Sequence, residues 1–83
     1  MAEYFVYIIK SMKDSGYYTG SCRCLEARLK YHNDGRQRST KNRVPFALVY
    51  FEVLSSKTEA LKREKQVKSY KGGVAFKKLV EGV

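Results

Sequence analysis

Glu64 is a carboxylate in a position where a helix would carry an apolar side chain. Residues 56–70 have the pattern of an amphipathic helix. Its apolar positions are Ala60, Leu61 and Val67. At 3.6 residues per turn, Glu64 projects between Leu61 and Val67. A carboxylate on a packed face is costly unless it is paired or binds a metal, so this position indicates a cation site. The alternative is an ordinary ion pair with Lys68, one turn further on.

Three other residues could act with this carboxylate: Tyr7, Arg28 and His32. Arg28 and His32 are four residues apart on a predicted helix, so they lie one above the other beside its apolar side. They would place a fixed positive charge and a titratable imidazole at the rim of the core. Each has an ordinary alternative: a surface arginine that covers apolar groups, and a histidine that caps a helix end. Tyr7 could equally be a core tyrosine whose hydroxyl has a partner.

A small sheet must position these side chains. Residues 4–9 are aromatic and β-branched, and they predict a strand that is apolar on both faces and therefore central. A polar turn over residues 10–16 and a returning strand over 17–19, ended by Gly20, would complete a hairpin. A third strand is predicted over residues 47–53.

Three helices are expected from periodicity and capping signals. The first covers residues 24–33 and stops at Gly35. The second follows a capping box with Ser56 as the N-cap and Glu59 as the third helical residue. The third is short and covers residues 74–80.

The resulting order β-β-α-β-α-α predicts an α+β fold, with α/β layers: a small, three-stranded, mostly antiparallel sheet flanked by helices. One domain is expected over residues 1–83, because a chain of 83 residues has room for one compact core. The longest apolar run is far too short to span a bilayer, and the N-terminus lacks the pattern of a signal peptide. The expected location is therefore the cytoplasm, with no membrane partner.

The charge of the chain indicates a polyanionic partner. Lys and Arg number 17 against 8 Asp and Glu, a formal net charge of +9, which is most often a sign of nucleic-acid binding. The alternative is a surface that lysines merely make soluble. The side chains predicted to follow a phosphate backbone are Arg36, Arg38, Lys41, Arg43 and Lys68. Two cysteines and one histidine are too few for a zinc site with four ligands.

Two tripeptides, Val6-Tyr7-Ile8 and Tyr18-Thr19-Gly20, resemble the paired signatures of the GIY-YIG endonuclease domain. Further along the chain, residues 25–29 with Arg28 resemble the first helix of that family, and His32 follows one turn later. Residues 59–64 resemble the later helix with the metal-binding glutamate, here Glu64. The resemblance covers almost the whole chain and is especially close to the small stand-alone GIY-YIG proteins of bacteria.

The resemblance implies a hydrolytic nuclease that uses one divalent metal ion, Mg²⁺ or Mn²⁺. Glu64 would hold the ion, and Tyr7 would activate the attacking water. Arg28 would stabilise the charge that develops on the phosphate, and Tyr18 would orient the phosphate or a water. A phenol titrates near a pH of about 10, so Tyr7 needs help, which His32 would provide from hydrogen-bond distance.

The expected function is a metal-dependent endonuclease that hydrolyses a nucleic-acid backbone, with DNA favoured over RNA. No segment resembles a base-reading helix. We therefore expect the substrate to be selected by its structure, as a single strand or a repair-related form, or through recruitment by another protein. Two features depart from the family: residues 70–80 lack an asparagine that many of its nucleases carry, and Ser21 stands where some relatives have lysine. The alternatives are a catalytically weak nucleic-acid-binding module on the same scaffold and an interaction domain for an acidic protein. The oligomeric state is left open.

Overall fold

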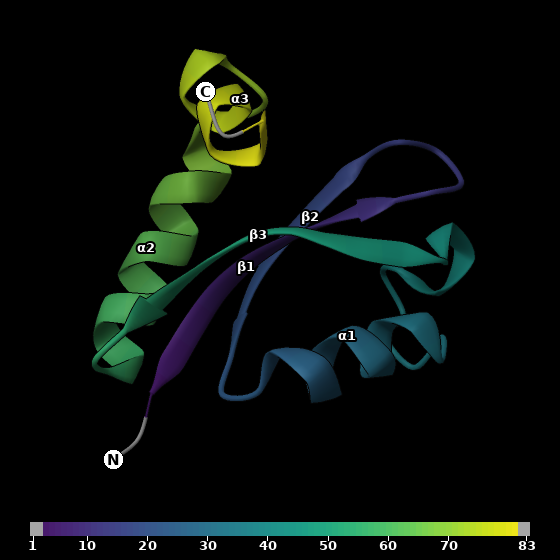
Figure 1. Cartoon of the computed structure of the whole chain (residues 1–83), viewed down its shortest axis with the longest axis horizontal. Coiled ribbons are helices and arrows are strands. Elements are labelled where there is room, and N and C mark those ends of the chain that lie inside the picture. Colours follow the sequence, from purple (N-terminus) through teal and green to yellow (C-terminus); the bar gives the residue numbers. More distant parts are fainter. Residues whose placement is uncertain (1–2, 82–83) are drawn as a thin grey trace.

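The computed structural model describes residues 3–81 and contains a three-stranded sheet between helices (Figure 1). In chain order the elements are β1 (Tyr4–Ser11), β2 (Tyr17–Cys22), α1 (Leu25–Asn33), the 3-10 turn η1 (Lys41–Arg43), β3 (Phe46–Leu54), α2 (Lys57–Ser69) and α3 (Val74–Glu81). The predicted fold class and element order are confirmed. Residues 1–2 and 82–83 of the predicted domain lie outside the described residues. None of the helices described is long and apolar enough to cross a membrane.

Strand β1 is the central strand of the sheet, whose order is β2-β1-β3 with antiparallel pairing throughout. The neighbouring residues Ile8 and Ile9, which point to opposite faces of the strand, are both fully buried, because each face packs under a helical layer. Tyr7 is paired with Gly20 on β2 and with Phe51 on β3. The predicted central position of this strand is confirmed.

Two apolar clusters lie on opposite faces of the sheet. The cluster beside α1 contains Tyr7, Ile9, Cys22 and Phe46, and the cluster beside α2 and α3 contains Ile8, Val67 and Phe76. Figure 1 shows α1 on one side of the strands and α2 with α3 on the other. Because side chains alternate along a strand, each residue of β1 is directed toward one layer or the other.

Helix α2 begins at Ser56, whose hydroxyl accepts a hydrogen bond from the backbone N–H of Glu59 at 3.1 Å. This half of the predicted capping box is confirmed. The Glu59 carboxylate does not return to the N-cap in that motif, but accepts from the Ser55 hydroxyl at 2.7 Å.

The packed stripe of α2 differs from the predicted one. Ala60 and Val67 are buried as expected, but Leu61 is 50% exposed, so its predicted place in the core is wrong. The stripe instead follows positions i, i+4 and i+7, and Glu64 is its middle member. The carboxylate therefore does lie on the packed side of the helix.

Strand β2 continues past Gly20 to Cys22, so the predicted end of the strand at Gly20 is wrong. Gly20 keeps its ladder position opposite Tyr7, and Ser21 is paired with Val6. The glycine here serves the close approach of a neighbouring side chain rather than a turn of the chain.

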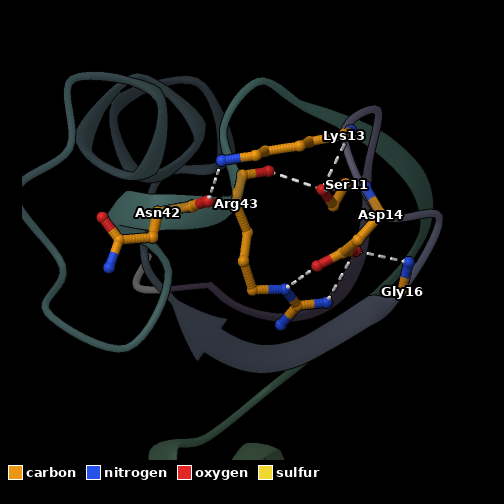
Figure 2. A network of polar contacts seen from close by, with 6 residues as sticks. All are labelled: Ser11, Lys13, Asp14, Gly16, Asn42 and Arg43. Carbon is orange, nitrogen blue, oxygen red and sulfur yellow. Dashed lines mark hydrogen bonds and ion pairs between the residues drawn. The ribbon is translucent and has the colours of Figure 1, made fainter.

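The turn between β1 and β2 is tied to the loop that precedes β3. The residues of this contact are Ser11, Lys13, Asp14, Gly16, Asn42 and Arg43 (Figure 2). Arg43 Nε donates to the Asp14 carboxylate at 2.9 Å, and the Ser11 hydroxyl donates to the Arg43 carbonyl. Lys13 Nζ donates to the Asn42 carbonyl at 3.0 Å. These contacts hold η1 against the hairpin.

Candidate functional site

Tyr7 and His32 meet in the core between β1 and α1. The Tyr7 hydroxyl lies 2.9 Å from His32 Nε2, and the two residues are 4% and 1% exposed. The predicted place of His32 at the rim of the core is wrong, because His32 is the buried residue of α1 while Leu25 and Leu29 are only half-buried. The predicted hydrogen-bond distance between Tyr7 and His32 is confirmed.

The His32 side chain is almost completely enclosed by other residues. Its Nδ1 lies 2.9 Å from the hydroxyl of Thr40, which is itself fully buried. The rings around the imidazole have centroids at 5.0 to 6.1 Å and belong to Tyr7, Tyr18, Tyr31 and Phe46. Burial, and to a smaller extent the Arg28 charge, lower the pKa of His32 below its usual value. The imidazole is therefore neutral at neutral pH.

Gly20 makes room for the Tyr7 hydroxyl. A Cβ atom at Gly20 would lie 2.5 Å from the Tyr7 hydroxyl oxygen and 2.7 Å from Cζ, distances that no side chain tolerates. Gly20 was recognisable in the sequence as part of the second tripeptide, but its contact with Tyr7 depends on the strand register and could not be read from spacing.

The Tyr7 phenol keeps its proton in the free protein. Burial raises the pKa of Tyr7 above that of an exposed tyrosine, the neighbouring Tyr18 adds to the rise, and the Arg28 charge acts against it. Because its pKa is high, Tyr7 is a phenol rather than a phenolate at neutral pH, with its hydroxyl in hydrogen-bond contact with the neutral imidazole of His32.

Arg28 and Tyr18 lie next to this pair. Arg28 is exposed on α1 one turn before His32, with its guanidinium 5.1 Å from the ring centre of Tyr31. Its charge acts on both Tyr7 and His32. Tyr18, on β2, is half-buried and its ring centre is 5.0 Å from that of His32. The structure therefore brings Tyr7 and Tyr18 against the His32 imidazole, with Arg28 one turn away on the same helix.

Glu64 approaches the same strands from the opposite face of the sheet. One carboxylate oxygen accepts from the Ser21 hydroxyl at 2.7 Å, and the other lies 2.8 Å from Lys68 Nζ. Ser21 follows Gly20 directly on β2, so the carboxylate is anchored beside the strand pair that carries Tyr7. The ordinary pair with Lys68 is present, and it coexists with the hydrogen bond from Ser21 on β2. Its charge contributes to the raised pKa of Tyr7.

The donor set fits a metal held by a single carboxylate. Among residues 3–81, no three His, Cys, Asp or Glu side chains are grouped closely enough to hold an ion. The Glu64 side chain, which is 18% exposed, offers hard oxygen ligands, and a bound cation would take the place of the Lys68 ammonium that lies 2.8 Å from one of them. Water and phosphate oxygens would complete the coordination, which Mg²⁺ and Mn²⁺ accept.

A groove of about 860 Å³ opens beside these residues. Ser21 and Arg28 form part of its wall, together with Tyr4, Arg23 and Lys57. Three cations and an aromatic ring in one groove suit a polyanion that carries flat bases. Arg23, Lys57 and Tyr4 were missed in the sequence, because they come from three separate segments that only the fold brings together.

The predicted phosphate-binding residues have different surroundings. Arg36, Arg38 and Lys41 are exposed in the segment between α1 and β3. Arg43 instead pairs with Asp14 at 2.9 Å, and Lys68 pairs with Glu64. The first three residues are thus exposed cations without an ion pair among the described residues, whereas Lys68 is exposed but paired.

The sequence of this chain matches the model of the GIY-YIG catalytic domain over residues 3–75. The chain belongs to the GIY-YIG family. The match includes every residue assigned to the site above, and the family is one of nucleases. Both tripeptides lie on paired strands, β1 and β2, as the sequence resemblance implied.

Similar GIY-YIG proteins carry the name UPF0213. One from Staphylococcus haemolyticus (strain JCSC1435) is 46% identical over 71 residues, covering 84% of this chain and 85% of that protein. One from Staphylococcus epidermidis (strain ATCC 12228) is 42% identical over 83 residues, covering 99% of this chain and 100% of that protein. A solution structure of a UPF0213 protein from Bacillus halodurans is 37% identical, covers 81% of this chain and 71% of that one, and has a TM-score of 0.49.

Proposed function

We propose that this protein is a metal-dependent endonuclease that hydrolyses the phosphodiester backbone of nucleic acid, with DNA favoured over RNA. The observation that carries the proposal is the buried hydrogen bond between Tyr7 and His32, formed next to Arg28. A buried tyrosine needs only some partner for its hydroxyl, but a neutral imidazole is also a base. One domain, spanning residues 1–83, would contain the whole site.

In the proposed reaction, Tyr7 and His32 move a proton away from the attacking water. The Tyr7 oxygen takes a proton from the water while its own proton passes to His32 Nε2. The resulting hydroxide forms a bond to phosphorus, and the bond from phosphorus to the sugar oxygen breaks. The sugar oxygen leaves with the bonding electron pair and takes a proton from solvent water. The high pKa of Tyr7 is no obstacle in this scheme, since a free phenolate is never required.

Other residues of the site would stabilise charge and hold the substrate. Arg28 would face the charge that develops on the phosphate oxygens, and Tyr18 would orient the phosphate or the water. Mg²⁺ or Mn²⁺ held by Glu64 would supply positive charge beside the phosphate. Arg36, Arg38 and Lys41 would extend phosphate contacts away from the site. Phosphate contacts carry no sequence information, so the substrate would be selected by its structure, by being single-stranded, or through a recruiting protein.

The ion pair between Lys68 and Glu64 favours one alternative function. With an ammonium group 2.8 Å from the carboxylate, the scaffold could bind nucleic acid without a metal and without cleavage. A domain that binds an acidic protein would show neither activity.

Incubation with single-stranded, nicked and branched DNA and with matching RNA, in Mg²⁺, Mn²⁺ or EDTA, tests the proposal. We expect cleavage that EDTA abolishes, and a loss of about 10²-fold or more in Tyr7→Phe, Arg28→Ala and Glu64→Ala. Tyr17→Phe, an exposed tyrosine on the same hairpin, is the matched control and should cleave normally. Metal-independent binding without cleavage would select the binding module, and wild-type cleavage in all three variants would overturn the assignment.

A further inference from the structure

Thr40 is a fully buried hydroxyl that the sequence did not single out. It lies eight residues after His32, just before η1, and its oxygen is 2.9 Å from His32 Nδ1. Among the described residues, Thr40 and Tyr7 are the two hydrogen-bond partners of the imidazole side chain. Threonine is mostly found at protein surfaces, so a completely buried one with this partner calls for an explanation.

Counting hydrogens assigns the tautomer of His32. Three hydrogens take part in the row of hydrogen bonds from Tyr7 through His32 to Thr40. They are those of the Tyr7 hydroxyl, the imidazole and the Thr40 hydroxyl. If the imidazole proton is on Nδ1, all three have acceptors, namely His32 Nε2, Thr40 Oγ1 and, at 3.4 Å, the Gln37 carbonyl. If the proton is on Nε2, the Tyr7 hydroxyl hydrogen has no acceptor among residues 3–81, which is costly in a buried position.

We propose that Thr40 is a positioning residue that holds the His32 proton on Nδ1 and thereby leaves the lone pair of Nε2 facing Tyr7. The inference rests on the proposed function for its catalytic meaning, because only this tautomer can accept the Tyr7 proton. Thr40 touches neither substrate nor water in this scheme. It acts through the imidazole, as a hydrogen-bond acceptor on the far side of the ring.

The backbone around Thr40 is held firmly enough for this role. Its N–H donates to the Gln37 carbonyl at 3.0 Å, and its carbonyl accepts from the Arg43 N–H at 2.9 Å. Arg43 is in turn fixed to Asp14 on the hairpin (Figure 2). The hydroxyl is therefore presented to His32 by a segment that is tied at both ends.

The test uses ¹⁵N nuclear magnetic resonance of the imidazole, which is unambiguous because the chain has 1 histidine. Long-range ¹H–¹⁵N spectra of the full chain, recorded at a pH of about 8 where the ring is neutral, distinguish the two nitrogens. Wild type should show a protonated Nδ1 and an unprotonated Nε2. Thr40→Ser keeps a hydroxyl and should keep this pattern. Thr40→Val keeps the shape but leaves the Nδ1 hydrogen without its acceptor, so the fraction of rings with the proton on Nε2 should rise measurably.

Thr19→Val is the matched control. It also removes a buried threonine hydroxyl, but on a residue paired with Ile8 rather than on the His32 loop, so the wild-type tautomer should remain. Cleavage should fall at least about tenfold in Thr40→Val and recover in Thr40→Ser, since a wrong imidazole tautomer is known to disable a hydrolase.

A wild-type spectrum with the proton on Nε2 would overturn the inference, and so would a Thr40→Val spectrum identical to wild type. The wild-type spectrum decides the question even if Thr40→Val does not fold. A protein that shows the expected tautomer but cleaves no nucleic acid would contradict the proposed function and leave the role of Thr40 toward His32 intact.

Discussion

His32 shows how a single residue can be both core and chemistry. It is 1% exposed, yet both ring nitrogens have hydroxyl partners, so an imidazole can occupy a place that an apolar side chain would otherwise fill. Its neutrality follows from burial, and its contact with Tyr7 gives a phenol of raised pKa a place to send its proton.

The lowered pKa of His32 predicts a pH-dependent stability. The unfolded chain binds the proton more tightly than the folded one, so the contribution is fully present above the unfolded pKa of about 6.5 and is lost as the pH falls toward the lower, folded pKa. Urea unfolding should give a midpoint that drops between a pH of about 7 and a pH of about 5.

The pKa values of two carboxylates, Asp14 and Glu52, are lowered in the folded protein. Their effect on stability therefore falls at a lower pH than that of His32. The variant His32→Gln therefore serves as the control, since it should flatten the dependence. A wild-type midpoint that does not move over the same range would contradict a buried, neutral His32.

A second prediction concerns Gly20. The substitution Gly20→Ala puts a methyl group 2.5 Å from the Tyr7 hydroxyl, so the tyrosine or the strand must shift. We expect a loss of about 1–3 kcal/mol in the free energy of unfolding, the usual cost of forcing an extra carbon into a packed site. Urea unfolding measures it, and an alanine variant as stable as wild type, with the Tyr7–His32 contact intact, would show that the approach is looser than described.

At the scale of elements, the segment between α1 and β3 is held by contacts to the hairpin rather than by its own regular structure. Its 3-10 helix, η1, is fixed by Arg43 to Asp14 and by the Arg43 carbonyl to Ser11 (Figure 2). A loop stabilised in this way can still present a side chain such as Thr40 accurately to a neighbouring helix.

Removal of the hairpin tie should loosen this loop. In Asp14→Ala, we expect faster amide hydrogen exchange over residues 40–43 and unchanged exchange in α2, because the lost ion pair is local and exposed. Glu26→Ala, which removes the same charge from α1, is the control. Equal exchange rates in Asp14→Ala and wild type would show that the backbone contacts of η1 suffice.

At the scale of the whole molecule, the formal net charge is +9, but not all of the cations are free to bind a phosphate. Arg36, Arg38 and Lys41 are exposed, whereas Arg43 and Lys68 have acidic partners. Phosphate contacts release counterions, so the number of free cations that meet the backbone sets the salt dependence of binding.

Arg36→Ala and Arg38→Ala should each reduce the slope of log K against log salt by about 1. Lys77→Ala, on α3 at the opposite face of the sheet (Figure 1), removes the same charge and should leave the slope unchanged. Fluorescence anisotropy with a labelled single strand measures the slopes. Binding that is insensitive to salt would exclude this segment as a path for phosphates.

Much of the fold could be predicted, because its signals are local. The apolar run of β1, the N-cap at Ser56 and the stop after α1 each depend on neighbouring residues. Gly35 takes a φ of 75°, the left-handed conformation that such a stop requires. The residues of the candidate site could be named from the sequence, because the two tripeptides and the spacings on the helices follow the order found in the GIY-YIG family.

What could not be predicted depends on contacts between distant segments. The depth of His32 follows from packing against β1, and the role of Thr40 from a loop without periodicity. Ser21 meets Glu64 across 43 residues, through a strand that continues past the point where a glycine suggested its end. Spacing along a helix or strand carries no information about such contacts.

The division of the proposed site between the two layers has a consequence for the cell that makes this protein. Tyr7 and His32 assemble when α1 docks on one face, whereas Glu64 arrives only when α2 docks on the other. A nascent chain that has emerged only as far as β3 therefore lacks the carboxylate. The proposed site is therefore incomplete in any partly folded state in which α2 has not docked on the sheet.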